Sequence, residues 1–239
     1  GSYGKLLLIA GSEGMAGAAV FAAKAAYRMG CGLVRVATVE SNRAILQQLV
    51  PEAVLAVYND TTDVVKFVET QLAWADAVAV GSGIGQSALS EKMVKTVIEQ
   101  NTKPCLFDAD ALNLLSKHPD WWKLVQSPLV ITPHLGEMAR LTGRPITEIR
   151  DRLVQTAQEF AMEHQITVVL KDARTITAQP DGQSYINVSG NHGMATAGAG
   201  DVLSGVVGAL LAQKLDMYLA AALGVFIHGL AGDAAAERV

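Results

Sequence analysis

Residues 191–205 read Asn-His-Gly-Met-Ala-Thr-Ala-Gly-Ala-Gly-Asp-Val-Leu-Ser-Gly, and this stretch decides how the rest of the chain is interpreted. Gly198 and Gly200 flank one alanine, and Asp201 opens an apolar segment that continues to Leu211, which predicts a turn followed by a buried helix. Glycines before a helix bring bare backbone N–H groups close to a ligand, and the first helical turn adds unpaired donors. The junction therefore suits an anion, and Asp201 would place a carboxylate beside it, as in phosphoryl-transfer sites.

The simpler interpretation is that Asp201 only caps the helix and that the glycines only form a turn. A second cluster of small and polar residues lies just upstream, at Asn191, Gly193, Met194 and Thr196. Such a long loop of small residues before a wholly apolar helix has no evident packing purpose. This favours a binding loop.

Composition restricts the class of protein. The chain has 239 residues, half of them hydrophobic, and a formal charge of −4. This length fits one α/β domain, and without a linker or repeat we predict a single domain over residues 1–239. No lysine- and arginine-rich run is present, which argues against nucleic-acid binding.

Location is predicted from cysteine usage and hydropathy. Cys31 and Cys105 have no metal-ligand spacing and are expected to be buried thiols in a reducing, cytoplasmic protein. The N-terminus lacks the pattern of a signal peptide. The apolar run that comes nearest to a membrane span, Met217 to Ala236, contains His228 and Asp233, so no membrane association is expected.

Short apolar strands alternate with helices, which predicts an α/β fold: a mostly parallel sheet covered by helices on both faces. The predicted strands are 5–10, 33–38, 53–57, 77–80, 105–107, 129–132 and 167–170, with a hairpin at 176–178 and 184–187. The predicted helices include one ending near Met29 and others at 43–50, 63–74, 87–100, 146–164, from 201 onward and at 217–237.

The loops after these strands are expected to meet along one edge of the sheet, where ligands bind in such folds. Each loop has a plainer alternative. The small residues 14–19 would equally suit helix packing. We expect Asp108 to serve the site and Asp110 to cap a helix. His134 and Glu137 fit ligand contact, with a capping box as the alternative.

The set of motifs, in this order, resembles the ADP- or ATP-dependent NAD(P)H-hydrate dehydratases of the ribokinase-like superfamily. The resemblance covers nearly the whole chain but not the epimerase domain that some relatives carry in front, which we expect to be absent here. It rests on residues 11–19, Gly-Ser-Gly-Ile-Gly at 81–85, Asp-Ala-Asp-Ala-Leu-Asn at 108–113, Thr-Pro-His-Leu-Gly-Glu at 132–137, and 190–201.

The resemblance implies a three-layer α/β/α fold and a cofactor-repair reaction. Reduced nicotinamide that has added water is phosphorylated on the ring hydroxyl, and phosphate then leaves to restore NAD(P)H. Mg²⁺ and ADP or ATP are implied as cofactor and co-substrate. A homo-oligomer, commonly a tetramer in the family, is also implied.

The resemblance also assigns residues to roles. Asp201 would be the catalytic base, and because it lies at a helix start we expect a lowered pKa and late proton transfer. The backbone N–H groups of residues 197–200 would stabilise the transferring phosphoryl group. Glu137, and less securely Asp108, would hold Mg²⁺ through water. Substrate contacts are implied at Ala18, Gly83, His134 and Asp201, and nucleotide contacts at Lys171, Asp172, Ala173, Arg174, Thr175, Gly198 and Gly200.

Two other functions remain open at this point. A small-alcohol or vitamin-precursor kinase of the same superfamily would share the Gly-Ala-Gly-Asp junction but stop after phosphorylation. A nucleotide sensor would use the same loops without chemistry, since fold alone does not confer function. Asp172 departs from the family pattern, in which glycine usually follows the lysine that corresponds to Lys171. The residues that would bind the adenosine part of the nucleotide are therefore less well defined. The choices between ADP and ATP, and between NADH and NADPH hydrate, stay open.

Overall fold

The computed structural model describes residues 2–238, so Gly1 and Val239, the ends of the predicted domain, lie outside the described residues. Nine strands form one sheet in the order β3-β2-β1-β4-β5-β6-β7-β8-β9. The strands are β1 (Lys5–Ile9), β2 (Leu33–Val39), β3 (Val54–Tyr58), β4 (Ala77–Val80), β5 (Cys105–Phe107), β6 (Leu129–Ile131), β7 (Thr167–Leu170), β8 (Ile176–Ala178) and β9 (Ser184–Ile186).

Neighbouring strands in the run β3-β2-β1-β4-β5-β6-β7 pair in parallel. Strand β8 pairs antiparallel with both β7 and β9, and β8 and β9 form the predicted hairpin. The helices are α1 (Ala16–Arg28), α2 (Arg43–Leu49), α3 (Val64–Trp74), α4 (Ala88–Gln100), α5 (Asp110–Lys117), α6 (Leu135–Thr142), α7 (Ile146–Asp151), α8 (Leu153–His164), α9 (Ala199–Ala212) and α10 (Met217–Ala236). Short 3-10 turns lie at η1 (Glu40–Asn42), η2 (Pro119–Leu124) and η3 (His192–Met194).

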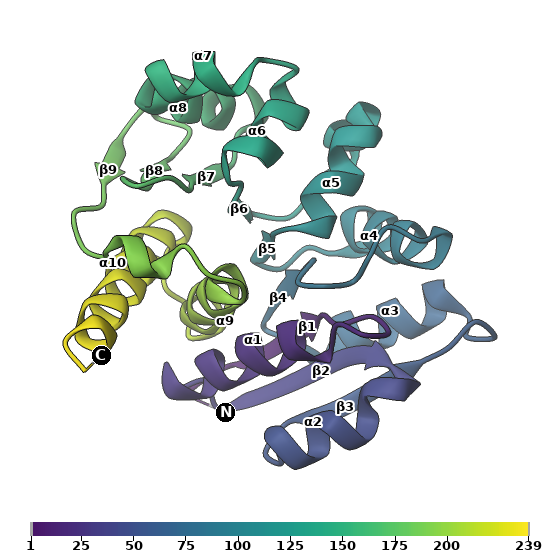
Figure 1. Ribbon diagram of the computed structural model, residues 1–239. Coiled ribbons are helices and arrows are strands. Elements are labelled where there is room, and N and C mark those ends of the chain that lie inside the picture. The colour runs from purple at the N-terminus through teal and green to yellow at the C-terminus, as the bar shows by residue number, and fades with distance from the viewer. Residues whose placement is uncertain (1, 239) are drawn as a thin grey trace.

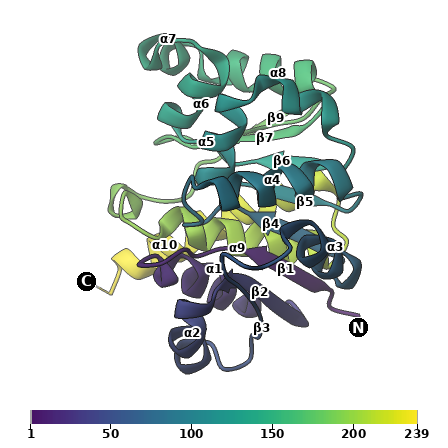
Figure 2. The same ribbon diagram turned by 90° about the vertical axis from the view of Figure 1, so that its right-hand side faces the viewer.

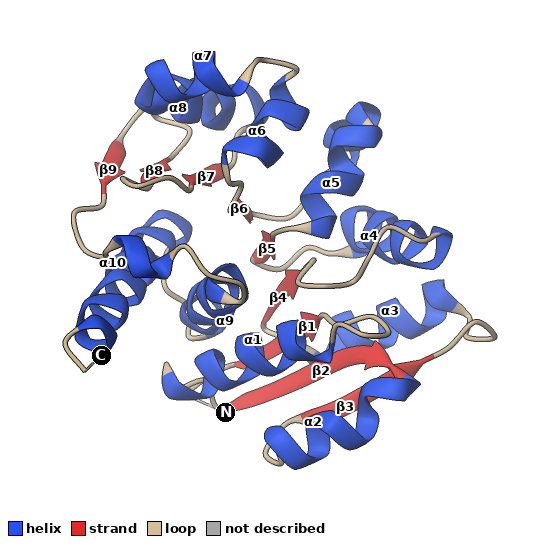
Figure 3. Cartoon of the chain, viewed as in Figure 1, coloured by secondary structure: helices blue, strands red, loops and turns tan. Residues whose placement is uncertain are grey.

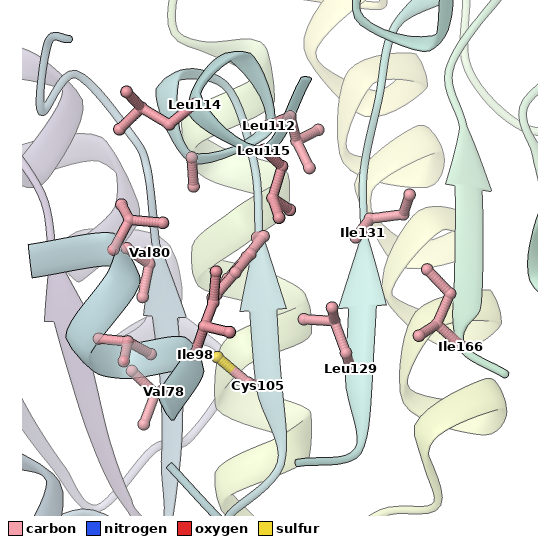
Figure 4. Packing of buried hydrophobic residues seen from close by; sticks show 14 of the residues in the cluster. Val78, Val80, Ile98, Cys105, Leu112, Leu114, Leu115, Leu129, Ile131 and Ile166 are labelled. Atoms are coloured by element: carbon pink, nitrogen blue, oxygen red, sulfur yellow. The ribbon is translucent and has the colours of Figure 1, made fainter. Parts of the chain in front are cut away.

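The sheet separates two hydrophobic cores because its strands are apolar on both faces. Helices α1, α2, α9 and α10 cover one face and α3 to α8 the other, giving the predicted three layers (Figures 1 and 3). Figure 2 shows the N-terminal strands and the hairpin at opposite ends of the sheet. Figure 4 shows the core on the face covered by α3 to α8, where side chains of β4, β5 and β6 pack against those of α4 and α5.

The order of the strands places the carboxyl ends of β1, β4, β5, β6 and β7 at one edge. The chain continues from β1 to β2 on one side and returns to β4 on the other, so the crevice that favours ligands opens between β1 and β4. The two loops there are joined directly. Gly11 N–H donates to Ser82 O at 2.8 Å, and Ser12 N–H donates to Gly83 O at 2.6 Å.

One predicted element was wrong: residues 146–164 form two helices, not one. The break falls at Arg152, whose backbone leaves the helical region (φ −127°, ψ 41°) and whose N–H is shared between the carbonyls of Glu148 and Ile149. Buried residues continue on both sides of the break, at Ile149 and Ala157. Apolar periodicity alone therefore could not reveal it.

Helix α10 passes a membrane-span test on length and composition alone, with a mean hydropathy of 1.5 over its most apolar window, and is the one helix in residues 2–238 to do so. Here it packs beside α9 and on β7 and β8. The cysteines match expectation: Cys31 and Cys105 are free and buried. Burial raises the pKa of both thiols, which makes them poor nucleophiles.

Candidate active site

Asp201 lies in the first turn of α9, but it does not cap the helix. The N-cap is Gly198, in the left-handed region at φ +89°, and it makes no side-chain cap bond. Asp201 is instead half-buried and lies close to Ser82, in the loop after β4. The capping interpretation of Asp201 is therefore wrong, and the carboxylate lies near the loop after β4 at the open crevice.

The predicted direction of the Asp201 pKa is also wrong. Burial raises the pKa of Asp201 above its ordinary value; the Ser82 hydroxyl opposes this, and the negative charge of Asp108 adds to it. The helix-end effect is outweighed because desolvation disfavours the ionised carboxylate. A raised pKa makes Asp201 a better base than expected.

Ala18 and Gly83, both predicted substrate contacts, lie against each other. Gly83 has φ +64°, and a methyl group built on it would come 2.8 Å from Ala18 Cβ. The same surface of α1 reaches the start of α9, where a methyl on Gly198 would come 2.8 Å from the ring of Phe21. The start of α1, the loop after β4 and the start of α9 are therefore in contact on this side of Asp201. A side chain at position 83 would have no room there.

On the other side of the α9 N-terminus lies a cavity of ≈ 980 Å³. It is lined by the start of α9, the loop after β7, the loop before α9 and part of α10. It is lined by His134, Lys171, Asp172, Ala173, Arg174, Thr175, Asn187, Ser189, Gly190, Asn191, His192, Met194, Ala195, Thr196, Ala199, Gly200, Leu203, Val225, His228 and Gly229. The predicted nucleotide segment 171–175 and Gly200 are thus brought together, whereas Gly198 does not line it.

The predicted substrate residues are divided between these two sides. His134 lines the large cavity, and Ala18, Gly83 and Asp201 do not. The two sides meet at Gly200 and Asp201, consecutive residues of one helical turn. A molecule at Gly83 and another in the cavity would therefore approach each other at this turn.

A buried ionic network lies beneath this turn. Lys171 Nζ donates to Asp108 Oδ1 at 2.8 Å, and Ser204 Oγ donates to Asp108 Oδ2 at 2.8 Å. Asp108 is 2% exposed, so both of its oxygens are used inside the protein. Burial alone would lower the pKa of Lys171, but the negative charges of Asp108, Glu137 and Asp201 outweigh it and raise the pKa.

His134 and Glu137 form the capping box that was the alternative for them. His134 N–H donates to Glu137 Oε2 at 2.8 Å, while His134 Nδ1 accepts from the N–H groups of Gly136 and Glu137. Burial lowers the pKa of His134, and nearby Lys171 lowers it further, so the imidazole is neutral near pH 7. Burial raises the pKa of Glu137, with Lys171 opposing.

Asp110 does not have the capping role predicted for it. The N-cap of α5 is Ala109, and Asp110 accepts a hydrogen bond from Gly85 N–H at 2.9 Å and another from the Gln86 amide. Asp110 therefore fixes the glycine loop after β4. Two adjacent strand ends come together there, a contact that spacing along the chain does not reveal.

Sequence reasoning assigned no role to several residues of this region. Ser82 lies close to Asp201, and Ser204 donates a hydrogen bond to Asp108. On α10, His228 lines the cavity, and Asp233 accepts from Gly190 N–H at 2.9 Å and from the Asn191 amide at 3.0 Å. The available signal was that His228 and Asp233 interrupt an otherwise apolar run, which marks the face of α10 that meets the loop.

The sequence and the fold are both similar to those of known proteins. The sequence profile of the NAD(P)H-hydrate dehydratase family matches residues 6–239. The chain is 40% identical over 244 residues to the bifunctional NAD(P)H-hydrate repair enzyme Nnr of Moorella thermoacetica, covering all of this chain and 46% of that protein. It is 37% identical to an ADP-dependent (S)-NAD(P)H-hydrate dehydratase of Neisseria meningitidis serogroup B, covering 99% of this chain and 79% of that one.

Among solved structures, the ADP/ATP-dependent NAD(P)H-hydrate dehydratase of Bacillus subtilis, co-crystallised with ATP/Mg²⁺ and soaked with CoA, superposes with a TM-score of 0.84. It is 30% identical, and the match covers 99% of this chain and 84% of that chain. The chain spans about half the length of the bifunctional relatives. The predicted ribokinase-like fold is confirmed, and the chain belongs to the NAD(P)H-hydrate dehydratase family.

Proposed function

We propose that this chain repairs NAD(P)H hydrate by ADP- or ATP-dependent dehydration. The observation that carries the proposal is the position of Asp201. Asp201 stands in the first turn of α9, close to Ser82, and is adjacent in sequence to Gly200, which lines the cavity together with 171–175. A hydroxyl bound on one side and a nucleotide phosphate on the other would meet beside it.

Asp201 orients the substrate hydroxyl and accepts its proton as the oxygen attacks the terminal phosphorus of the nucleotide. The phosphorus–oxygen bond to the leaving nucleotide breaks in the same displacement. The backbone N–H groups of residues 197–200 face the transferring group, and Lys171 adds a positive charge nearby. In the structure the N–H of Ala199 is held weakly by Thr196 O at 3.4 Å, so it is easily given up to a phosphate.

The phosphorylated ring then loses phosphate. The lone pair of the ring nitrogen expels it, and loss of a proton from the neighbouring carbon restores the dihydronicotinamide. Phosphorylation matters because phosphate is a far better leaving group than hydroxide. His134 lines the cavity, so its neutral imidazole would serve as a hydrogen-bond partner for the part of the substrate that extends past Gly200 into the cavity.

One residue of the site fits Mg²⁺. This ion usually binds through one or two carboxylates, water and phosphates. Residues 2–238 contain no cluster of three side chains that could hold a metal ion. Glu137, 5% exposed and beside Lys171, would hold it through water. Asp108 does not fit, because Lys171 and Ser204 occupy its oxygens. When bound, the ion would neutralise charge on the phosphates.

The proposal is tested by incubating NADH hydrate or NADPH hydrate with the protein, magnesium and either ADP or ATP. Return of the reduced-nicotinamide absorbance together with free phosphate supports the dehydratase. A stable phosphoester would instead identify a small-alcohol kinase, and nucleotide binding without turnover would identify a sensor. Running ADP and ATP side by side also decides the donor.

Ser82→Ala is expected to move the acidic limb of the kcat/KM profile to higher pH and to lower kcat about threefold. The Ser82 hydroxyl lowers the pKa of Asp201, so its removal lets that pKa rise and the base is protonated at a higher pH. Ser116→Ala, which loses a hydroxyl bonded to Asn113 O, is the control. An unchanged acidic limb would show that Asp201 is not the titrating base.

We also propose that residues 1–239 are one ribokinase-like domain, which the single nine-stranded sheet supports. We also propose a cytoplasmic location, which the two free cysteines support. A homo-oligomer is proposed because Leu219, Phe226 and Leu230 of α10 are exposed. Light scattering of the purified protein distinguishes a tetramer from smaller states.

A further inference from the structure

The network beneath the α9 N-terminus joins three separate elements. Asp108 follows β5, Lys171 follows β7, and Ser204 stands one turn after Asp201 on α9. Asp108 and Ser204 are each 2% exposed, whereas 21% of the Lys171 side chain is exposed and lines the cavity. The two partners are therefore sealed inside the protein, and only the lysine reaches the cavity.

Lys171 is held at the point where the two sides of the site meet. A methyl group on Gly200 would lie 3.6 Å from Lys171 Nζ and 3.7 Å from Asp108 Oδ2. Within residues 2–238, Asp108 is the side chain that accepts from Nζ, which leaves two of its three hydrogens for a ligand. A long, flexible lysine would otherwise adopt many rotamers, so a fixed acceptor is needed to hold its charge at Gly200.

We propose that Ser204 and Asp108 are positioning residues: Ser204 orients the Asp108 carboxylate, which holds the Lys171 ammonium beside Gly200 for the transferring phosphoryl group. This inference rests on the proposed function. A purely structural alternative exists, because a buried hydroxyl bonded to a carboxylate also stabilises the fold. The two are separable, since only positioning depends on the presence of Lys171.

Without the Ser204 hydroxyl, Asp108 Oδ2 loses its partner and the carboxylate can rotate, carrying the ammonium away from Gly200. Interactions stronger in the transition state than in the ground state affect kcat most. Ser204→Ala is therefore expected to lower kcat about tenfold, or about 1.4 kcal/mol, and to raise the Kd for ADP only about threefold.

The experiment is a double-mutant cycle on the full chain with Ser204→Ala, Lys171→Met and both together. Single-turnover rates are measured with NADH hydrate and ATP, the Kd for ADP by calorimetry, and the melting temperature for each protein. If Ser204 acts through Lys171, Ser204→Ala changes the single-turnover rate and the Kd for ADP by less than about twofold in the Lys171→Met background. Ser204→Ala still lowers the melting temperature in that background. Thr96→Ala, which loses a buried hydroxyl bonded to Lys92 O, is expected to lower the melting temperature with kcat unchanged.

Equal effects of Ser204→Ala in both backgrounds, or a wild-type rate and Kd in the single variant, would overturn the positioning role. If the Lys171→Met rate falls below detection, the Kd for ADP decides the cycle alone. Failure of the proposed function has a different signature: the wild-type protein itself would then restore no NADH from the hydrate.

Discussion

Asp201→Asn is expected to lower kcat for hydrate dehydration about 1,000-fold, within the range for loss of a positioned base. Asparagine keeps the size and polarity of the side chain beside Ser82, so the loops should stay in place. It cannot take the proton of the attacking hydroxyl. Single-turnover kinetics with NADH hydrate measure the loss.

Nucleotide binding provides the internal check on this variant. The cavity walls at 171–175 do not include Asp201, so the Kd for ADP should change by less than about threefold. Asp216→Asn is a matched control because Asp216 caps α10, and asparagine is an equally good N-cap. Wild-type turnover by Asp201→Asn would refute the role of the carboxylate.

Although Asp201→Asn is expected to lose activity, it should be at least as stable as the wild-type protein. The pKa of Asp201 is raised in the folded protein, so the folded state binds the proton more tightly than the unfolded state. Above the folded pKa the ionised carboxylate therefore costs stability, and below the ordinary value of 3.8 that cost vanishes. At pH 7 the variant should melt at or up to about 3 °C above wild type, because partial access to water limits the cost. Thermal melts from pH 3.5 to pH 8 test this, and a lower melting temperature at pH 7 would contradict it.

Gly205→Ala is expected to destabilise the fold by about 3 kcal/mol, at the upper end of ordinary overpacking. A methyl group at Gly205 would meet the backbone of Ala22 on α1, with 2.9 Å to its Cα and a still closer approach to its carbonyl oxygen. Backbone cannot move aside as a side chain can, so α1 and α9 would have to separate. A loss of about 6–12 °C in melting temperature follows for a chain of this size.

Gly208→Ala is the matched control on the same helix. Its methyl group would lie 3.2 Å from the two Cδ atoms of Leu6, which are able to shift. Alanine also favours helix over glycine by about 1 kcal/mol, so the net change should be within about 1 kcal/mol of zero. Equal melting temperatures for the two variants would show that the α1–α9 contact is not close in solution.

The sequence predicted the layers, the hairpin and almost every strand because short apolar runs bounded by turns are strong local signals. It also predicted that the loops meet at one edge, since that follows from a parallel sheet. Arg152 shows the limit of periodicity: apolar spacing continues through a break that only the backbone reveals.

The site was harder to predict than the fold because its chemistry depends on burial. For Asp201, position at a helix start predicted a lowered pKa, but desolvation by other elements reversed the direction. Asp110 was expected to cap its own helix, and it bonds the loop after another strand. In both cases the deciding partner lies far away in sequence.

In the proposed mechanism the start of α9 supplies main-chain N–H groups and the Asp201 carboxylate, whereas much of the cavity lining comes from two separate loops, at 171–175 and 187–196. Evolution or an engineer could therefore exchange residues 172–175 and 187–196 to accept a different nucleobase while Lys171 and the start of α9 stay unchanged. The choice of nucleotide donor and the chemical step would then depend on different segments of the chain.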